Sequence, residues 1–305
     1  MPLTIACIGE CMIELSQVDL EGGQAKVGFA GDTLNTATYL ARLLPDARVS
    51  YITNLGMDAF SARMLANFIA EGIDTALIGL HPDRLPGLYS IEIDAAGERS
   101  FRYWREASAA RTLFSGIGAG LDDLDGFDVI YLSGITLAIL PASVRAVLIS
   151  KLAVLRDAGK TVVFDTNHRP RLWPGAQTAR DAFTAMWQAS SIALPSFDDE
   201  ERLYPGTDLA AVLDRISGLG LQEIVLKNGA DGPMIRHNGA TLQTALPRAD
   251  TVCDTSGAGD SFNAGYLAAR LKGADPIHAA TAGHALASTV IAHHGAIIAR
   301  AVMRA

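Results

Sequence analysis

The chain has 305 residues, of which 33 are acidic and 25 basic, and its formal net charge is −8 at pH 7. This length suits one large α/β domain with a small appendage, and an acidic chain without a long basic run is not expected to bind nucleic acid. Any anionic ligand must therefore be held locally by Arg, Lys or backbone N–H groups.

The cysteines and the hydropathy exclude two further classes of protein. Cys7, Cys11 and Cys253 have no Cys-x-x-Cys spacing and no accompanying His pair at ligand spacing, so neither a disulfide framework nor a zinc site is expected. The sequence begins without a basic signal region, and no apolar run reaches the roughly 18–20 residues that span a bilayer. We expect a cytoplasmic protein without a membrane partner; a monomer and a homo-oligomer both stay open.

Strands and helices are predicted to alternate along the first eighty residues. The apolar run at 3–9 is typical of a buried parallel strand, and the helix that follows ends at Pro45. The predicted elements are strands at 3–9 and 12–15, a helix at 32–44, a strand at 49–53, a helix at 58–71 and a strand at 75–80. This order predicts a parallel sheet with crossover helices.

Residues 86–106 break this rhythm. Polar and apolar residues alternate at 88–93 and 99–105 around a turn at 94–97, which is typical of a β-hairpin. Together with residues 11–29 the hairpin is expected to build a small second sheet that serves as a lid; a hairpin without function is the alternative.

The second half of the chain returns to the α/β pattern. The predicted elements are strands at 128–133, 161–164, 192–195 and 223–226, a hairpin of 233–236 and 241–244, and helices at 143–158, after 257 and at 275–291. The fold class is therefore α/β, with a doubly wound, mostly parallel sheet flanked by helices. We expect one domain over residues 1–305, with the lid inserted in it.

The stretch from Asp254 to Arg270 begins as a glycine-rich polar loop and continues as an apolar-periodic helix. The first N–H groups of a helix lack intrahelical partners, and Gly257, Ala258 and Gly259 leave room for an anion such as phosphate to approach them. Asp260, in the first turn, could accept a proton from a hydroxyl that attacks this phosphate. Ordinary helix capping is the alternative for Gly-Ala-Gly-Asp alone.

The full stretch Asp-Thr-Ser-Gly-Ala-Gly-Asp-Ser-Phe, followed by Asn-Ala-Gly, closely resembles the C-terminal signature of the ribokinase-like carbohydrate kinases, the phosphofructokinase-B family. The resemblance implies that Asp260 is the catalytic base. Gly31-Asp32-x-x-Asn35 at a predicted helix start resembles the family's sugar-binding signature, and it implies that Gly31, Asp32 and Asn35 meet substrate hydroxyls. Ala30 departs from the second Gly that many relatives have there.

The resemblance also implies groups for Mg²⁺ and for an acid or phosphate charge. Arg169, in the segment 165–170 at the end of a predicted strand, would be a cation beside the substrate. Ser196 and Asp199 stand at the spacing where relatives have Asn-x-x-Glu, with Glu200 next to them. Carboxylates suit Mg²⁺ that keeps its waters, and whether Asp199 or Glu200 serves the metal stays open. A plain acidic helix start is the alternative.

Two further segments resemble the nucleotide side of the family. Lys227-Asn228-Gly229-Ala230-Asp231-Gly232 resembles a turn at the ATP phosphates, and it implies nucleotide-binding roles for Ser196, Lys227, Gly229 and Gly232 as well as for Gly257 and Gly259. The loop at 293–296 resembles the one that flanks the adenine and a monovalent cation such as K⁺. The two adjacent His side chains there need not converge on a metal.

Within the family, residues 31–36, 103–105 and 194–200 look most like kinases that phosphorylate the terminal hydroxyl of a keto-deoxy sugar acid. Arg105 fits this reading because a guanidinium binds a carboxylate bidentately, whereas Arg99, Arg102 and Arg111 could equally be solvated surface residues. The expected ligands are a small sugar acid, ATP and Mg²⁺, and the residues expected to contact the sugar are Gly31, Asp32, Asn35, Tyr89, Tyr103, Arg105, Arg169 and Asp260. A neutral-sugar kinase such as a fructokinase or ribokinase, a kinase of another sugar acid, and a non-catalytic sugar-binding regulator are the rivals.

Overall fold

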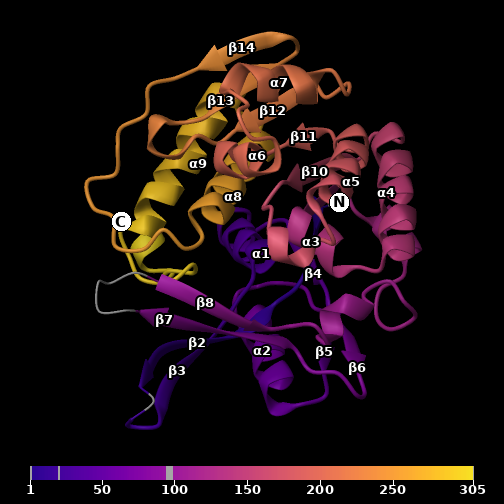
Figure 1. Ribbon diagram of the computed structural model, residues 1–305, viewed down its shortest axis with the longest axis vertical. Helices are drawn as coiled ribbons and strands as arrows, with labels where there is room; N and C mark the ends of the chain where they lie inside the picture. Colours follow the sequence, from indigo (N-terminus) through magenta and orange to yellow (C-terminus); the bar gives the residue numbers. More distant parts are fainter. Residues whose placement is uncertain (1, 20, 94–98, 305) are drawn as a thin grey trace.

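A central eight-stranded sheet organises the molecule, for which a computed structural model describes residues 2–19, 21–93 and 99–304 (Figure 1). The strand order is β14-β13-β12-β11-β10-β9-β1-β4, in which the strands from β12 to β4 run parallel and β13 and β14 run antiparallel. The strands are β1 (Thr4–Ile8), β4 (Arg48–Ile52), β9 (Val129–Ser133), β10 (Thr161–Asp165), β11 (Ile192–Ala193), β12 (Glu223–Leu226), β13 (Met234–His237) and β14 (Ala240–Gln243).

Both faces of this sheet are apolar and covered by helices. In β1, Ala6 and Ile8 pack on one side and Ile5 and Cys7 on the other, because successive side chains of a strand point to opposite faces. On the first side lie α3 (Gly134–Ile139), α4 (Ala142–Asp157), α5 (Ala176–Gln188), α6 (Phe197–Leu203) and α7 (Leu209–Ser217). On the second side lie α1 (Asp32–Leu43), α2 (Ala59–Ala70), α8 (Ala258–Leu271) and α9 (Pro276–Ile291). The predicted doubly wound α/β class is confirmed.

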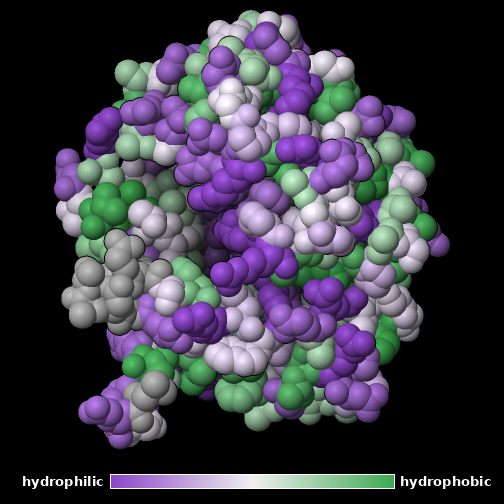
Figure 2. Space-filling view, viewed as in Figure 1, coloured by the Kyte–Doolittle hydropathy of each residue, from purple (hydrophilic) through white to green (hydrophobic). Residues whose placement is uncertain are grey.

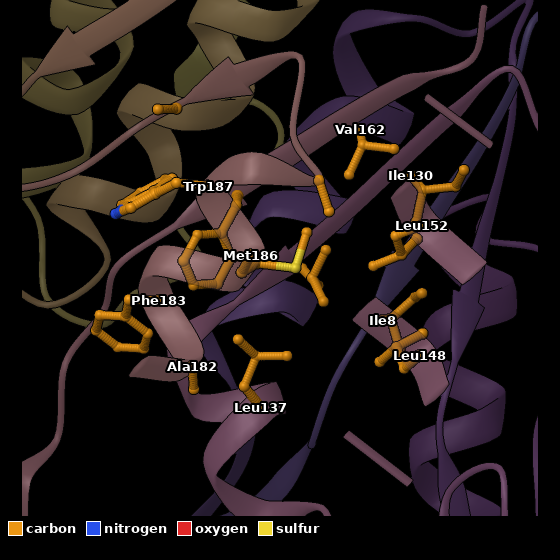
Figure 3. Close-up of a cluster of buried hydrophobic side chains, with 14 of the residues drawn as sticks. Ile8, Ile130, Leu137, Leu148, Leu152, Val162, Ala182, Phe183, Met186 and Trp187 are labelled. Carbon is orange, nitrogen blue, oxygen red and sulfur yellow. The ribbon is translucent and has the colours of Figure 1, made fainter. Parts of the chain in front are cut away.

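Helix α5, which the sequence pattern did not indicate, supplies much of the first core (Figure 3). Phe183, Met186 and Trp187 are buried on its inner face, and the Trp187 ring packs edge-on against Phe164 of β10 with centroids 4.6 Å apart. Burying a large apolar side chain contributes roughly 1.5–3 kcal/mol. This packing fixes the end of β10, which carries polar residues of the site.

A separate four-stranded sheet lies beside the central one (Figure 1). Its order is β3-β2-β7-β8, formed by β2 (Met12–Asp19), β3 (Gln24–Ala30), β7 (Gly87–Ile93) and β8 (Arg99–Trp104). The predicted small second sheet is therefore present, whereas its predicted turn at 94–97 lies outside the described residues. That this sheet closes as a lid stays a prediction.

The predicted strand at 75–80 is wrong for residues 75–78, and only Gly79 and Leu80 of it are in a strand. Asp74 pairs with Ser50 at the edge of β4 and accepts the Ala76 N–H at 3.1 Å, so the chain turns before it pairs again as β6 (Gly79–His81) with β5 (Asn54–Gly56). Short 3₁₀ helices occupy Ala109–Thr112, Leu121–Gly126, Pro170–Leu172, Gly229–Asp231 and Val302–Arg304. Within the described ranges, every helix is too short or too polar to cross a bilayer.

Candidate active site

Polar residues collect where the parallel strands end and where α1 and α8 begin. Asp165 ends β10, Lys227 follows β12, and Glu10 follows β1. In an open parallel sheet this carboxyl edge is where ligands bind. Figure 2 shows a hollow lined mainly by hydrophilic residues on the side of the molecule where α1, α8 and the small sheet meet in Figure 1.

The start of α8 is shaped by a glycine in the left-handed region. Gly257 has φ 73°, and a Cβ built there would lie 2.8 Å from the carbonyl oxygen of Ala296. Both observations exclude a side chain at this position. The Ala258 N–H donates to the Thr255 carbonyl at 3.2 Å, whereas the N–H groups of Gly257 and Gly259 have no acceptor among the described residues. Two amides at a helix N-terminus are thus free for an anion.

Helix α1 packs on α8 and brings the predicted sugar signature to the predicted base. The Asn35 side-chain amide donates to the Asp260 carboxylate at 2.7 Å, across 225 residues of sequence. The Thr36 hydroxyl donates to the Asp260 carbonyl at 3.2 Å. The other Asn35 side-chain atom, Oδ1, is buried without a partner in the described part of the chain. Asp32 in the same helix turn accepts a bond from the Asn167 amide at 2.7 Å.

The environment of Asp260 raises its affinity for a proton. Burial raises the pKa of this carboxyl first, the negative charge of Asp32 raises it further, and the hydrogen bond from Asn35 opposes both. Asp165 adds a smaller increase and Lys227 a smaller decrease, and the resulting pKa is about 7 instead of 3.8. A carboxylate with a pKa near neutrality is suited to accept a proton in the transition state and release it afterwards.

A buried polar network lies behind Asp260. Lys227 Nζ donates to Asp165 Oδ1 and to Asn263 Oδ1, both at 3.0 Å. The Asn263 amide nitrogen donates to Asp165 Oδ2 at 2.8 Å and to the Tyr131 hydroxyl at 3.0 Å. The Tyr131 hydroxyl also lies at hydrogen-bond distance, 3.3 Å, from the Thr36 hydroxyl, which connects the network to α1. These bonds join β9, β10, α1 and α8 behind the base.

The residues predicted on the small sheet lie close to one another. The rings of Tyr89 and Tyr103 pack with centroids 5.8 Å apart, the Tyr89 hydroxyl bonds Glu14, and the Tyr103 side chain stays exposed. Arg105 is buried where β8 leaves the sheet, and its guanidinium pairs with the buried Glu10 at the end of β1. Arg105 Nε has no partner in the described ranges, so part of the guanidinium remains available to an acceptor.

The two carboxylates predicted for a metal face different surroundings. Asp199 accepts the His168 N–H at 3.0 Å and lies 3.9 Å from Arg169, which is half-exposed at the end of the β10 segment. Glu200 is fully buried and pairs with Arg215 of α7, and burial raises the pKa of this carboxyl to about 7. No group of three His, Cys, Asp or Glu side chains positioned to hold a metal occurs in the described part of the molecule.

The predicted nucleotide segments border the same edge of the sheet. Ser196 caps α6 and forms a parallel bridge with Lys227, and Gly229 and Gly232 have φ values of 50° and 80° in the turn that follows. The Gly295 N–H donates to Asp254 at 2.8 Å, which ties the loop at 293–296 to the start of α8.

A groove that no sequence motif predicts lies beside this loop. The groove, of about 390 Å³, lies between residues 246–251 and α9. Its lining includes Thr251, His284 and Ser288. The chain runs from its wall directly into the free amides of α8, so the two features adjoin.

Three polar residues of the site, of which Glu10 and Asn263 are buried and Asn167 is half-buried, were not assigned a role from the sequence. Asn167 and Asn263 stand within the motifs at 165–170 and 254–265, but the roles of all three appear only in their contacts with Arg105, Asp32 and Lys227. Glu10 follows a buried strand at its carboxyl end, which is a signal that sequence reasoning could have used. Asn167 has φ 31°, which places its side chain from a tight turn after β10.

The fold and the site are typical of a carbohydrate kinase, and comparison with known proteins confirms this class. The family model described as pfkB family carbohydrate kinase matches residues 3–301. The chain therefore belongs to the pfkB family of carbohydrate kinases and is a phosphotransferase.

The relatives within the family are more specific. A protein of Dickeya dadantii named 2-dehydro-3-deoxygluconokinase is 47% identical over 302 residues and covers 96% of each chain. One of the same name from Escherichia coli K12 is 45% identical over 313 residues and covers both chains completely. A solved structure of a ribokinase II from Escherichia coli, in complex with ATP and Mg²⁺, has a TM-score of 0.83 at 18% identity over 97% of this chain and 94% of its own, which supports the ribokinase-like fold.

Proposed function

We propose that this protein is an ATP-dependent kinase that phosphorylates the C6 hydroxyl of 2-keto-3-deoxygluconate, the compound written 2-dehydro-3-deoxygluconate in its relatives' names. The observation that carries the proposal is the Asp260 carboxylate, which is bonded to Asn35 and lies in the same helix turn as two free amides. The names of full-length relatives at 45% and 47% identity support the choice of substrate.

The sugar end of the reaction is assigned to α1 and α8. The Asp32 carboxylate and the unpartnered Asn35 Oδ1 are acceptors for substrate hydroxyls. As the C6 oxygen attacks the γ-phosphorus of ATP, a new P–O bond forms, the bond to the ADP oxygen breaks, and Asp260 takes the hydroxyl proton.

The charge that develops on the transferred phosphoryl group is met by the start of α8. The N–H groups of Gly257 and Gly259 are fixed in place and point outward at the positive end of the helix dipole. Donors that are fixed before the reaction stabilise the transition state without reorganisation, and one such donor typically contributes about 10²–10³ in kcat.

The nucleotide is assigned to the C-terminal half of the sheet. The groove of about 390 Å³ between residues 246–251 and α9 has the position and size to take the base, because its wall leads directly to the free amides of α8. The glycines of the turn at 229–232 allow backbone close to the phosphates.

Asp199 rather than Glu200 is proposed to serve Mg²⁺ through water. Both carboxylates are buried: Glu200 pairs with Arg215 of α7, whereas Asp199 accepts the His168 N–H beside the segment after β10 and lies 3.3 Å from Arg202 and 3.9 Å from Arg169. A carboxylate at that position is a ligand type that Mg²⁺ accepts. When bound, the metal neutralises charge on the ATP phosphates. Whether a monovalent cation binds near residues 293–296 follows from the family resemblance alone.

The acid and phosphate charges are assigned to Arg105 and Arg169. Arg105 presents an unpartnered buried Nε beside the small sheet, and Arg169 is half-exposed after β10. Tyr89 and Tyr103 would cover the sugar when the small sheet closes over it and excludes water.

An ADP-release screen tests the proposal. The panel contains 2-keto-3-deoxygluconate, its C4 epimer 2-keto-3-deoxygalactonate, gluconate, fructose and ribose, each with ATP and Mg²⁺, with Asp260→Asn as the blank. We expect the highest kcat/KM for 2-keto-3-deoxygluconate. A preference for fructose or ribose would contradict the acid assignment, and the absence of ADP with every sugar would indicate a non-catalytic binding protein.

A further inference from the structure

The ammonium group of Lys227 lies beside the first turn of α8, and one of its N–H donors has no acceptor among the described residues. Two of its three N–H donors are used, by Asp165 and by Asn263, each at 3.0 Å. The third has no acceptor among the described residues. A Cβ built on Gly259 would lie 3.7 Å from Lys227 Nζ, so the ammonium stands next to one of the two free amides.

The surroundings fix this position. Asp165 and Asn263 are both buried, and the Lys227 side chain is 12% exposed. Asn263 is held from its other end by Tyr131, so the ammonium cannot shift without breaking several buried bonds. The bonds to Asp165 and Asn263 hold the ammonium beside Gly259, one of the two residues whose free amides are proposed to meet the phosphate.

We propose that Lys227 is a catalytic residue whose third N–H donates to the transferring phosphoryl group, and that Asp165 and Asn263 are the residues that position it. The inference rests on the proposed function and deepens it, because the sequence resemblance implied only a nucleotide-binding role for this lysine. The charge-assisted bond joins the amides of Gly257 and Gly259 and strengthens as negative charge moves onto the phosphoryl oxygens.

The first variant is Lys227→Met, which removes the charge and keeps most of the side-chain volume. We expect kcat with 2-keto-3-deoxygluconate to fall by about 10²–10³, the loss typical of one transition-state donor, while KM for ATP changes less than about threefold. Lys272→Met at the other end of α8 is the matched control, since this lysine bonds only the Leu43 carbonyl among the described residues, and its kcat should match the wild type.

A second variant separates catalysis from folding, because Lys227→Met alone leaves the Asp165 carboxylate buried and unpaired. Asp165→Asn/Lys227→Met removes both charges together, which is often tolerated where the loss of one is not. We expect the double variant to melt close to the wild type and to retain the low kcat of the single variant. Recovery of kcat in the double variant, or a wild-type kcat in Lys227→Met, would overturn the proposal.

The pH dependence of kcat/KM distinguishes a catalytic from a purely structural role of Lys227, because loss of a structural lysine would not shift it. Lys227 lowers the pKa of Asp260 and Asp165 raises it. The rising limb of kcat/KM should therefore shift to higher pH in Lys227→Met and return toward its wild-type position in the double variant. If the rising part of the kcat/KM profile has the wild-type pKa in both variants, the proposed position of the Lys227 ammonium beside Asp260 is contradicted. If the wild type itself releases no ADP in the substrate screen, the proposed function has failed, and this outcome is distinguishable from a wild-type enzyme that is unaffected by Lys227→Met.

Discussion

Replacing Asp260 by Asn is expected to stabilise the protein while it removes most of its turnover. The pKa of this carboxyl is raised from 3.8 to about 7 in the folded state. Each factor of ten in proton affinity corresponds to about 1.4 kcal/mol, so ionised Asp260 destabilises the fold by up to about 4 kcal/mol. Partial exposure in the hollow screens the charge, and we expect Asp260→Asn to gain about 2–4 kcal/mol.

The sign of the pH dependence follows from the raised pKa. Because the folded state holds the proton more tightly than the unfolded chain, the wild type loses stability as the pH rises from about 4 to 7. Asn does not titrate, so the advantage of the variant is small near pH 4, grows across this window and is complete above pH 7. At pH 8, where Asp260 of the wild type is ionised, kcat of the variant should be lower by about 10²–10⁴, since the base is missing.

Urea denaturation at pH 5 and pH 8, together with ADP release, measures both effects. Asp198→Asn is the control, because Asp198 is an exposed carboxylate in the first turn of α6 and its loss removes a favourable interaction with the helix dipole. This control should be slightly less stable and fully active. An Asp260→Asn variant that is no more stable than the wild type at pH 8, or that turns over at a wild-type rate, would refute the reasoning.

Three further predictions concern the same site and the core. In the wild type, kcat/KM for 2-keto-3-deoxygluconate should rise with pH and level off with an apparent pKa near 7, because Asp260 must lose its proton to act. A rise in kcat/KM with an apparent pKa near 4 would contradict this prediction. Gly257→Ala should destabilise the protein by at least about 1–2 kcal/mol and lower kcat at least tenfold, whereas Gly273→Ala, at φ 90° with open space around it, should share only the backbone strain and keep its kcat. Trp187→Ala should cost about 3–5 kcal/mol in urea denaturation without changing KM, since the ring is buried against Phe164; a loss below 1 kcal/mol would contradict the packing.

The sequence predicted the elements whose signals are local. Strand β1 is a continuous apolar run because both of its faces are buried, and α1 and α4 show apolar stripes of helical period. Helix α5, which begins after Gly175 without a side-chain cap, was not predicted from the sequence. The segment at 75–80 looks like a strand, but Asp74 and Thr75 form a turn before the chain pairs.

The sequence allowed predictions for candidate site residues that lie within a local motif, but it did not predict contacts between residues that are distant in sequence. The motifs at 254–265 and 31–35 predict the base and the sugar-binding residues, whereas the bond between Asn35 and Asp260 joins positions that no spacing rule connects. Arg105 was expected to face a ligand carboxylate, and the structure adds that Glu10 already holds one edge of it. The choice between Asp199 and Glu200 depends on which carboxylate α7 covers, which is a tertiary property.

The most direct measurement of the central claim is the phosphorus NMR spectrum of the product formed from ATP and 2-keto-3-deoxygluconate by the wild-type enzyme. A phosphate ester at C6 couples to the two protons of a methylene group, and an ester at C4 or C5 couples to one proton. We predict a new monoester signal split into a triplet, appearing with ADP and absent with Asp260→Asn. A doublet would place the phosphate on another hydroxyl, and a spectrum that shows only ATP, or only ADP and inorganic phosphate, would contradict the account.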